Sequence, residues 1–191
     1  MAFVYQDATL EPGKLELLTA WLPSQSWFPG GTVEKIAGAY RFDDPAGEVG
    51  LEGQLVRLDD GRVVHAPLSY RAAPLAGAED FLVGTTEHSA LGTRWVYDAV
   101  GDPVWAAALA TAILTGGTQA DIYVEVDGVQ ERREPRTKVR GSGTDGTPVP
   151  DATDLDLVVV RVVGFADETF DETLTATWPD GGPAVVAGIR G

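Results

Sequence analysis

The sequence predicts an α+β fold in which a curved antiparallel β-sheet packs on one main helix, with a short helix near the N-terminus. Strand-like runs follow one another with short polar turns between them, and only two segments show the apolar spacing of a helix. Successive strands joined by tight turns pair antiparallel, and helices kept apart from the strands are typical of the α+β class. We expect the concave face of the sheet to lie over the main helix and to bury Trp and Leu side chains there.

The short helix is predicted over residues 14–22. Pro23 ends it, because proline cannot continue a helix. The apolar residues recur at helical spacing, so we expect one face to carry Leu15, Leu18, Trp21 and Leu22.

The main helix is predicted over about residues 102–115. Asp102 can accept hydrogen bonds from the free N–H groups of the first turn, and Pro103 suits the first helical position. Gly116 and Gly117 follow the last apolar residue and end the helix. Trp105 belongs to the apolar stripe of this helix and is therefore predicted to lie in the core.

The strands are predicted from alternating apolar residues bounded by turn residues. Asp59-Asp60-Gly61 separates two of these runs and predicts a β-hairpin. The predicted strands are 32–42, 49–58, 62–71, 81–86, 93–98, 122–126, 155–164, 173–178 and 184–189.

The composition excludes several classes of protein. The chain has 29 acidic and 14 basic residues, a net charge of −15, so it repels nucleic-acid phosphates. It has no cysteine, which excludes disulfides, zinc–thiolate sites and thiol nucleophiles. The longest apolar run, 104–114, is far shorter than the ~20 residues of a membrane span. We expect an acidic cytoplasmic protein that binds neither nucleic acid nor membrane.

One ordered set of motifs resembles a known family. Trp27-Phe28-Pro29-Gly30-Gly31 leads into the strands, and the run 97–103 opens an alanine-rich helix. This order resembles the N-terminal cap domain of the actinobacterial maltokinases, which phosphorylate maltose on the way to glycogen and trehalose. The resemblance covers about residues 14–128 and implies a curved antiparallel sheet packed on a helix. The chain departs from the family's aromatic motif at Thr32, where the family has lysine.

The resemblance suggests a division of the chain. Residues 1–140 would form the cap-like domain, and 141–191 a loop with a C-terminal β-extension packed on the same domain. Residues 141–153 are rich in Gly, Pro, Asp and Thr, which is typical of a loop. Residues 141–146 match the dinucleotide-binding pattern G-x-G-x-x-G, but Pro148 and Pro150 preclude the helix that would hold the pyrophosphate.

Kinase chemistry is not expected from this sequence. Phosphoryl transfer needs a phosphate-holding loop, a residue that orients the acceptor hydroxyl and carboxylates for magnesium. The sequence has no P-loop, no His-x-Asp loop and no Asp-Phe-Gly or Asp-Phe-Glu motif. His65 and His88, the only histidines, have no metal-ligand spacing. We assign no catalytic residue, no cofactor and no metal.

Two segments are candidates for an interaction surface. The first is the aromatic pair Trp27 and Phe28. The second is a basic segment that holds five of the 14 basic residues within nine positions: Arg132, Arg133, Arg136, Lys138 and Arg140. The basic segment could bind an acidic partner or a phosphorylated sugar, or it could be a solvated strand edge whose charges prevent sheet association.

Two functions follow from these observations. The first is a non-catalytic cap-like module that serves maltose, glycogen and trehalose metabolism by interacting with a kinase, another carbohydrate-metabolism enzyme or a second copy of itself. The alternative is a protein that binds a sugar or sugar phosphate in a pocket of the concave sheet. A deep pocket with convergent polar groups would favour ligand binding, and an exposed apolar patch would favour interaction.

Overall fold

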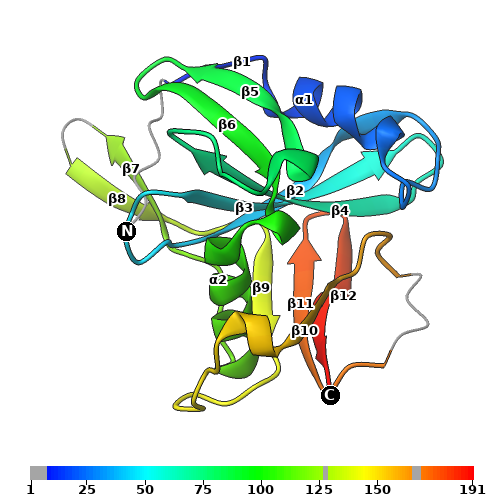
Figure 1. The fold of residues 1–191 in the computed structure, drawn as a ribbon, viewed down its shortest axis with the longest axis vertical. Helices are drawn as coiled ribbons and strands as arrows, with labels where there is room; N and C mark the ends of the chain where they lie inside the picture. The colour runs from blue at the N-terminus through cyan, green and yellow to red at the C-terminus, as the bar shows by residue number, and fades with distance from the viewer. Residues whose placement is uncertain (1–7, 127–128, 165–168) are drawn as a thin grey trace.

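The computed structural model describes residues 8–126, 129–164 and 169–191 and has the predicted α+β class. A curled six-stranded antiparallel sheet carries helix α1 on one side and helix α2 with a second, four-stranded sheet on the other (Figure 1). The helices are α1 (Lys14–Trp21) and α2 (Pro103–Leu114). Neither helix in this part of the chain has the length and apolar character needed to cross a membrane.

The larger sheet has the strand order β1-β5-β6-β4-β3-β2. Its strands are β1 (Leu10–Glu11), β2 (Val33–Phe42), β3 (Gly50–Leu58), β4 (Val63–Arg71), β5 (Leu82–His88) and β6 (Gly92–Asp98). The predicted hairpin at Asp59-Asp60-Gly61 is confirmed, because β3 and β4 pair antiparallel on either side of it. Gly61 has φ +87°, a conformation that glycine adopts without steric cost.

The C-terminal strands form a separate sheet with the order β10-β12-β11-β9. Its strands are β9 (Lys138–Gly141), β10 (Asp156–Val159), β11 (Glu172–Trp178) and β12 (Gly181–Arg190). A two-stranded hairpin of β7 (Ile122–Val126) and β8 (Val129–Arg133) precedes it. The described residues also form four short 3₁₀ helices: η1 (Leu22–Ser24), η2 (Glu79–Phe81), η3 (Ala99–Gly101) and η4 (Ala152–Asp154). The predicted division after residue 140 falls within β9 and stays a prediction.

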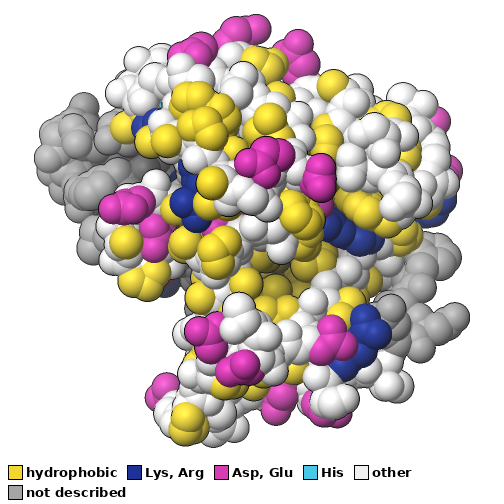
Figure 2. Space-filling view, viewed as in Figure 1, with side chains coloured by type: hydrophobic (Ala, Val, Ile, Leu, Met, Phe, Trp, Pro, Cys, Tyr) yellow, Lys and Arg dark blue, Asp and Glu magenta, His cyan; other side chains and the backbone are white. Residues whose placement is uncertain are grey.

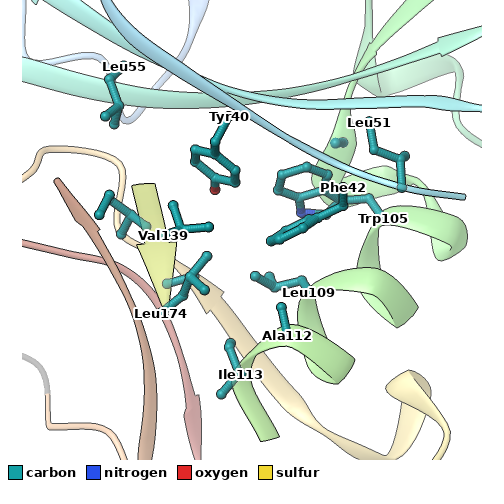
Figure 3. Close-up of a cluster of buried hydrophobic side chains, with 14 of the residues drawn as sticks. Tyr40, Phe42, Leu51, Leu55, Trp105, Leu109, Ala112, Ile113, Val139 and Leu174 are labelled. Atoms are coloured by element: carbon teal, nitrogen blue, oxygen red, sulfur yellow. The ribbon is translucent and has the colours of Figure 1, made fainter. Parts of the chain in front are cut away.

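A core between the two sheets surrounds α2 (Figure 3). Trp105 is 1% exposed, which confirms its predicted core position. Its indole packs against the Phe42 and Tyr40 rings, with centroid separations of 5.5 and 6.3 Å. The same cluster contains side chains from both sheets and α2: Leu51, Leu55, Leu109, Ala112, Ile113, Val139 and Leu174.

A second core lies between the larger sheet and α1. The helix buries Leu17, Leu18 and Trp21, so the prediction that Leu15 lies on the buried face is wrong. A helix turns by about 100° per residue, which places Leu15 about 110° from the centre of the buried stripe. Leu15 is 38% exposed.

Both ends of α2 are satisfied by hydrogen bonds. Asp102 accepts from the Val104 N–H at 3.0 Å, which confirms the predicted N-cap. At the other end, N–H groups of the loop after β9 donate to the last helical carbonyls: Gly143 to Ile113 at 2.9 Å and Thr144 to Leu114 at 3.0 Å. The glycine pattern at 141–146 therefore caps a helix C-terminus and, as predicted, does not open a helix.

A short segment after β10 connects the two sheets. The Val160 N–H donates to Val186 in the smaller sheet, and the Val163 N–H donates to Val63 in the larger one, both at 2.9 Å. Between them, the Arg161 carbonyl accepts from the His65 N–H at 2.8 Å. The two sheets are therefore joined by backbone hydrogen bonds as well as by a shared core.

Candidate ligand-binding site

A cavity of about 660 Å³ lies on the α1 side of the larger sheet. All six strands and the start of α1 contribute to its lining, including Leu10, Lys14, Arg41, Glu52, Tyr70, His88 and Arg94. Strands β1 and β2 are the opposite edges of this sheet, and they can reach one cavity only if the sheet curls toward it. The concave face is therefore on the α1 side, and the expectation that it lies over α2 is wrong.

Glu52 lies at the inner end of the cavity and is only 7% exposed. Alternation along β3 points Leu51 into the core around α2 and Glu52 toward α1. The Lys14 ammonium lies 2.9 and 2.6 Å from the two Glu52 carboxylate oxygens, and Arg41 Nε lies 3.9 Å from Oε1. Gln54 Nε2 donates to the same carboxylate at 2.8 Å.

These neighbours decide the charge of Glu52. Burial would raise the pKa of this carboxyl, but the Lys14 ammonium and the Arg41 guanidinium together bring it below its ordinary value. Glu52 is therefore ionised at neutral pH. It is a buried carboxylate that can only accept hydrogen bonds.

Three buried polar atoms around this carboxylate have no hydrogen-bond partner among the described residues: Arg41 Nε, Gln54 Oε1 and Tyr70 Oη. Burial and the neighbouring Glu52 charge raise the pKa of Tyr70, although the two groups lack the geometry of a hydrogen bond. Unpartnered buried polar atoms are costly and rare in folded proteins. Two of the three residues, Arg41 and Tyr70, line the cavity, where a polar molecule could satisfy them.

The outer part of the cavity carries more charge. Burial would raise the pKa of Asp44, but backbone N–H groups of Val49, Ala46 and Glu48 donate to this carboxylate and lower it overall. Asp43 and Glu48 are exposed lining residues. Burial and the Arg94 guanidinium lower the pKa of His88, so its ring is neutral at pH 7.

The two aromatic residues of the predicted interaction surface lie away from this cavity. Trp27 and Phe28 are half-buried and pack against the α1-side core. The Trp27 ring meets Trp21 edge-on at 5.8 Å, and the Arg161 guanidinium stacks over it at 4.4 Å. Both contacts tie the segment after α1 to the fold.

The basic segment lies on β8, β9 and the turn between them, and all five of its cationic side chains are exposed. Arg132 pairs with Asp121 at 2.6 Å, and Lys138 lies 3.5 Å from Glu134. The other three have no acidic side chain within 4.0 Å among the described residues: Arg133, Arg136 and Arg140. The structure does not bring this segment together with the cavity-lining residues.

His65 has a structural position. It is fully buried, with Nε2 3.0 Å from the Tyr40 hydroxyl and Nδ1 3.0 Å from the Val186 carbonyl oxygen. Burial and then the Arg161 charge lower the pKa of His65 to about 3. A neutral imidazole therefore bridges the two sheets at physiological pH.

The cavity residues were missed in the sequence because they are far apart in it. Lys14, Arg41, Glu52 and Tyr70 come from four different elements, and none belongs to a recognised spacing. One local signal was available. Glu52 and Gln54 alternate along a strand whose same face continues with Val56, and a polar pair on a face that becomes apolar indicates a buried polar site.

The fold and the cavity define a curled antiparallel-sheet domain closed by a short helix around a polar site. Residues 21–102 match the model of the maltokinase N-terminal cap domain, which confirms the resemblance seen in the sequence. The match covers less than half of the chain, from the end of α1 to the N-cap of α2. A search of curated proteins finds no match.

Proposed function

We propose that this chain is a non-catalytic accessory module of maltose, glycogen and trehalose metabolism that binds a sugar or sugar phosphate in its concave cavity. The observation that supports this most directly is that six strands and α1 together line one cavity, which contains the buried Glu52 carboxylate. The family match supports the link to sugar metabolism through residues 21–102, which include Arg41, Glu52 and Tyr70. We place its action in the cytoplasm.

The size and lining of the cavity favour small-molecule binding. Its volume of about 660 Å³ falls within the range of about 300–1,000 Å³ that is usual for ligand sites. Apolar side chains such as Leu10 and Leu91 alternate with charged groups around it. Polar groups that converge from different elements fix the orientation of a ligand, which a flat interaction surface does not require.

Binding is tested by titration calorimetry with maltose, trehalose, glucose 1-phosphate and glucose 6-phosphate. We expect at least one of them to bind with millimolar or tighter affinity. Replacing Arg41 with glutamine should weaken that binding at least tenfold, because hydrogen bonds to charged groups contribute about 1.5–3 kcal/mol. Arg133→Gln makes the same change on an exposed side chain outside the cavity and serves as the control. Failure of all four compounds to bind the wild type would refute the proposed function.

An interaction role has its own support. Figure 2 shows hydrophobic side chains gathered in a hollow between the larger sheet and the part of the molecule that contains α2 and the C-terminal strands. Three large apolar side chains are also more than one-third exposed on η2, β5 and η3: Phe81, Leu82 and Val100. We propose that an acidic partner, either a carbohydrate-metabolism enzyme or a second copy of this chain, docks at the basic segment, where Arg133, Arg136 and Arg140 are exposed and have no acidic side chain within 4.0 Å among the described residues.

Reversing Arg133 and Arg136 to glutamate should weaken such a complex, and so should added salt, because attraction between exposed charges is screened over ~8 Å at physiological ionic strength. Light scattering at low and high salt measures self-association, and recovery of the partner measures a heterocomplex. A double reversal of Lys35 and Arg190 changes the net charge equally at other exposed positions and is the control. Equal behaviour of the two double variants would exclude a docking role for the basic segment.

A further inference from the structure

The charges that line the cavity do not suit an anionic ligand. Its cationic side chains are Lys14, Arg41 and Arg94, and its acidic ones are Asp43, Asp44, Glu48 and Glu52. With His88 neutral, three positive and four negative charges face the site. The whole chain carries a net charge of −15, so its long-range field also opposes an approaching anion.

The two innermost cations are already committed to a carboxylate. Lys14 Nζ contacts both Glu52 oxygens, at 2.9 and 2.6 Å, and the ammonium is also 5.7 Å from the centre of the Tyr70 ring. Arg41 Nε lies 3.9 Å from the same carboxylate. A phosphate that bound either cation would have to approach the ionised Glu52 as well, and like charges at such distances repel strongly when they are partly buried.

The hydrogen-bonding capacity that remains is mixed. The Glu52 carboxylate accepts, the buried Arg41 Nε–H donates, and the buried Tyr70 hydroxyl can do either. An alcohol hydroxyl matches this set, because it donates to a carboxylate while it accepts from a guanidinium. A phosphate dianion only accepts hydrogen bonds, so it can satisfy Arg41 but not Glu52.

We infer that the cavity takes an uncharged, polyhydroxylated molecule such as a neutral saccharide, with hydroxyl groups placed between Glu52, Arg41 and Tyr70, and that it discriminates against the phosphorylated form of the same molecule. This inference rests on the proposed function, since it requires that the cavity binds a ligand. The proposed function allows either a sugar or a sugar phosphate as the ligand, and the charges of the cavity favour the sugar.

The test compares matched pairs by calorimetry at low ionic strength: trehalose with trehalose 6-phosphate, and glucose with glucose 6-phosphate. For wild-type protein we expect the neutral member of a pair to bind at least tenfold more tightly than the phosphorylated member. Tyr70→Phe should weaken binding of the neutral sugar about fivefold without lowering the melting temperature, because the hydroxyl has no hydrogen-bond partner among the described residues.

Glu52→Gln should invert the preference, because it removes the carboxylate and leaves the charges of Lys14 and Arg41 free to bind phosphate. The control is Glu34→Gln, which removes one negative charge at an exposed residue outside the cavity and should keep the preference for the neutral sugar. Circular dichroism establishes that each variant is folded, and Tyr70→Phe provides the test if Glu52→Gln is not. Tighter binding of the phosphorylated sugars by wild type would overturn the inference and leave the proposed function standing. Absence of binding by all four compounds, and by maltose and glucose 1-phosphate as well, would defeat both.

Discussion

Replacing Trp105 with alanine is expected to lower the free energy of unfolding by about 3–5 kcal/mol. The indole is 1% exposed and fills the space between α2 and the larger sheet, against Tyr40 and Phe42. Alanine would leave a cavity that the two sheets cannot close without shifting. Since a domain of this kind is stable by about 5–15 kcal/mol, much of the protein should be unfolded at moderate temperature.

Urea and thermal melts followed by circular dichroism measure this loss. Phe81→Ala is the matched control, because it also truncates an aromatic side chain, but one that is 37% exposed at η2. We expect the control to lower stability much less. Equal melting curves for wild type and Trp105→Ala would mean that α2 is not packed on the sheet as the structure has it.

Gly143→Ala is expected to be the other severe substitution, with a loss of about 3 kcal/mol. An added Cβ would lie less than 3.0 Å from the carbonyl oxygens of both Leu114 and Ile113. These are backbone atoms at the end of α2, so they cannot rotate away as a side chain would. The loop would have to move, which would break the hydrogen bonds from Gly143 and Thr144 that cap the helix.

Gly13→Ala is the control for this substitution. Gly13 precedes α1 with φ −71°, which any residue adopts, and an added Cβ would come no closer than 3.9 Å to a neighbouring atom. Its melting temperature should therefore stay near that of wild type, while Gly143→Ala should melt several degrees lower. Equal melting temperatures for Gly143→Ala and Gly13→Ala would show that the loop after β9 does not stabilise the end of α2.

The sequence predicted the features that depend on neighbouring residues. The hairpin at Asp59-Asp60-Gly61 and the cap at Asp102 each depend on a few consecutive residues, and the structure contains both. The direction of sheet curvature and the position of Leu15 were predicted incorrectly, whereas Leu18, Trp21 and Leu22 of the same predicted face are buried. Both depend on which face of the larger sheet is covered by α1 and which by α2 and the smaller sheet. The spacing of apolar residues within one segment does not determine that arrangement.

The candidate site could not be predicted for the same reason. Lys14 and Glu52 are 38 positions apart and meet only because α1 folds over the curled sheet. In a chain with 29 acidic residues, the alternation of Glu52 and Gln54 along β3 indicates at most a buried polar pair, and it does not show which cations surround the carboxylate. The aromatic pair at Trp27 was visible because its members are adjacent in sequence, yet it packs against Trp21 and Arg161.

The core around α2 extends beyond the segment that matches the family model. The matched segment ends at residue 102, but the side chains that cover its strands on the α2 face come later in the chain, from Trp105, Val139 and Leu174. Excised alone, residues 21–102 would present Tyr40, Leu51 and Leu55 to water. The segment that matches the family model is therefore smaller than the unit that buries its own core, and a fragment cut at residues 21 and 102 would lack the layer that covers this face of the sheet.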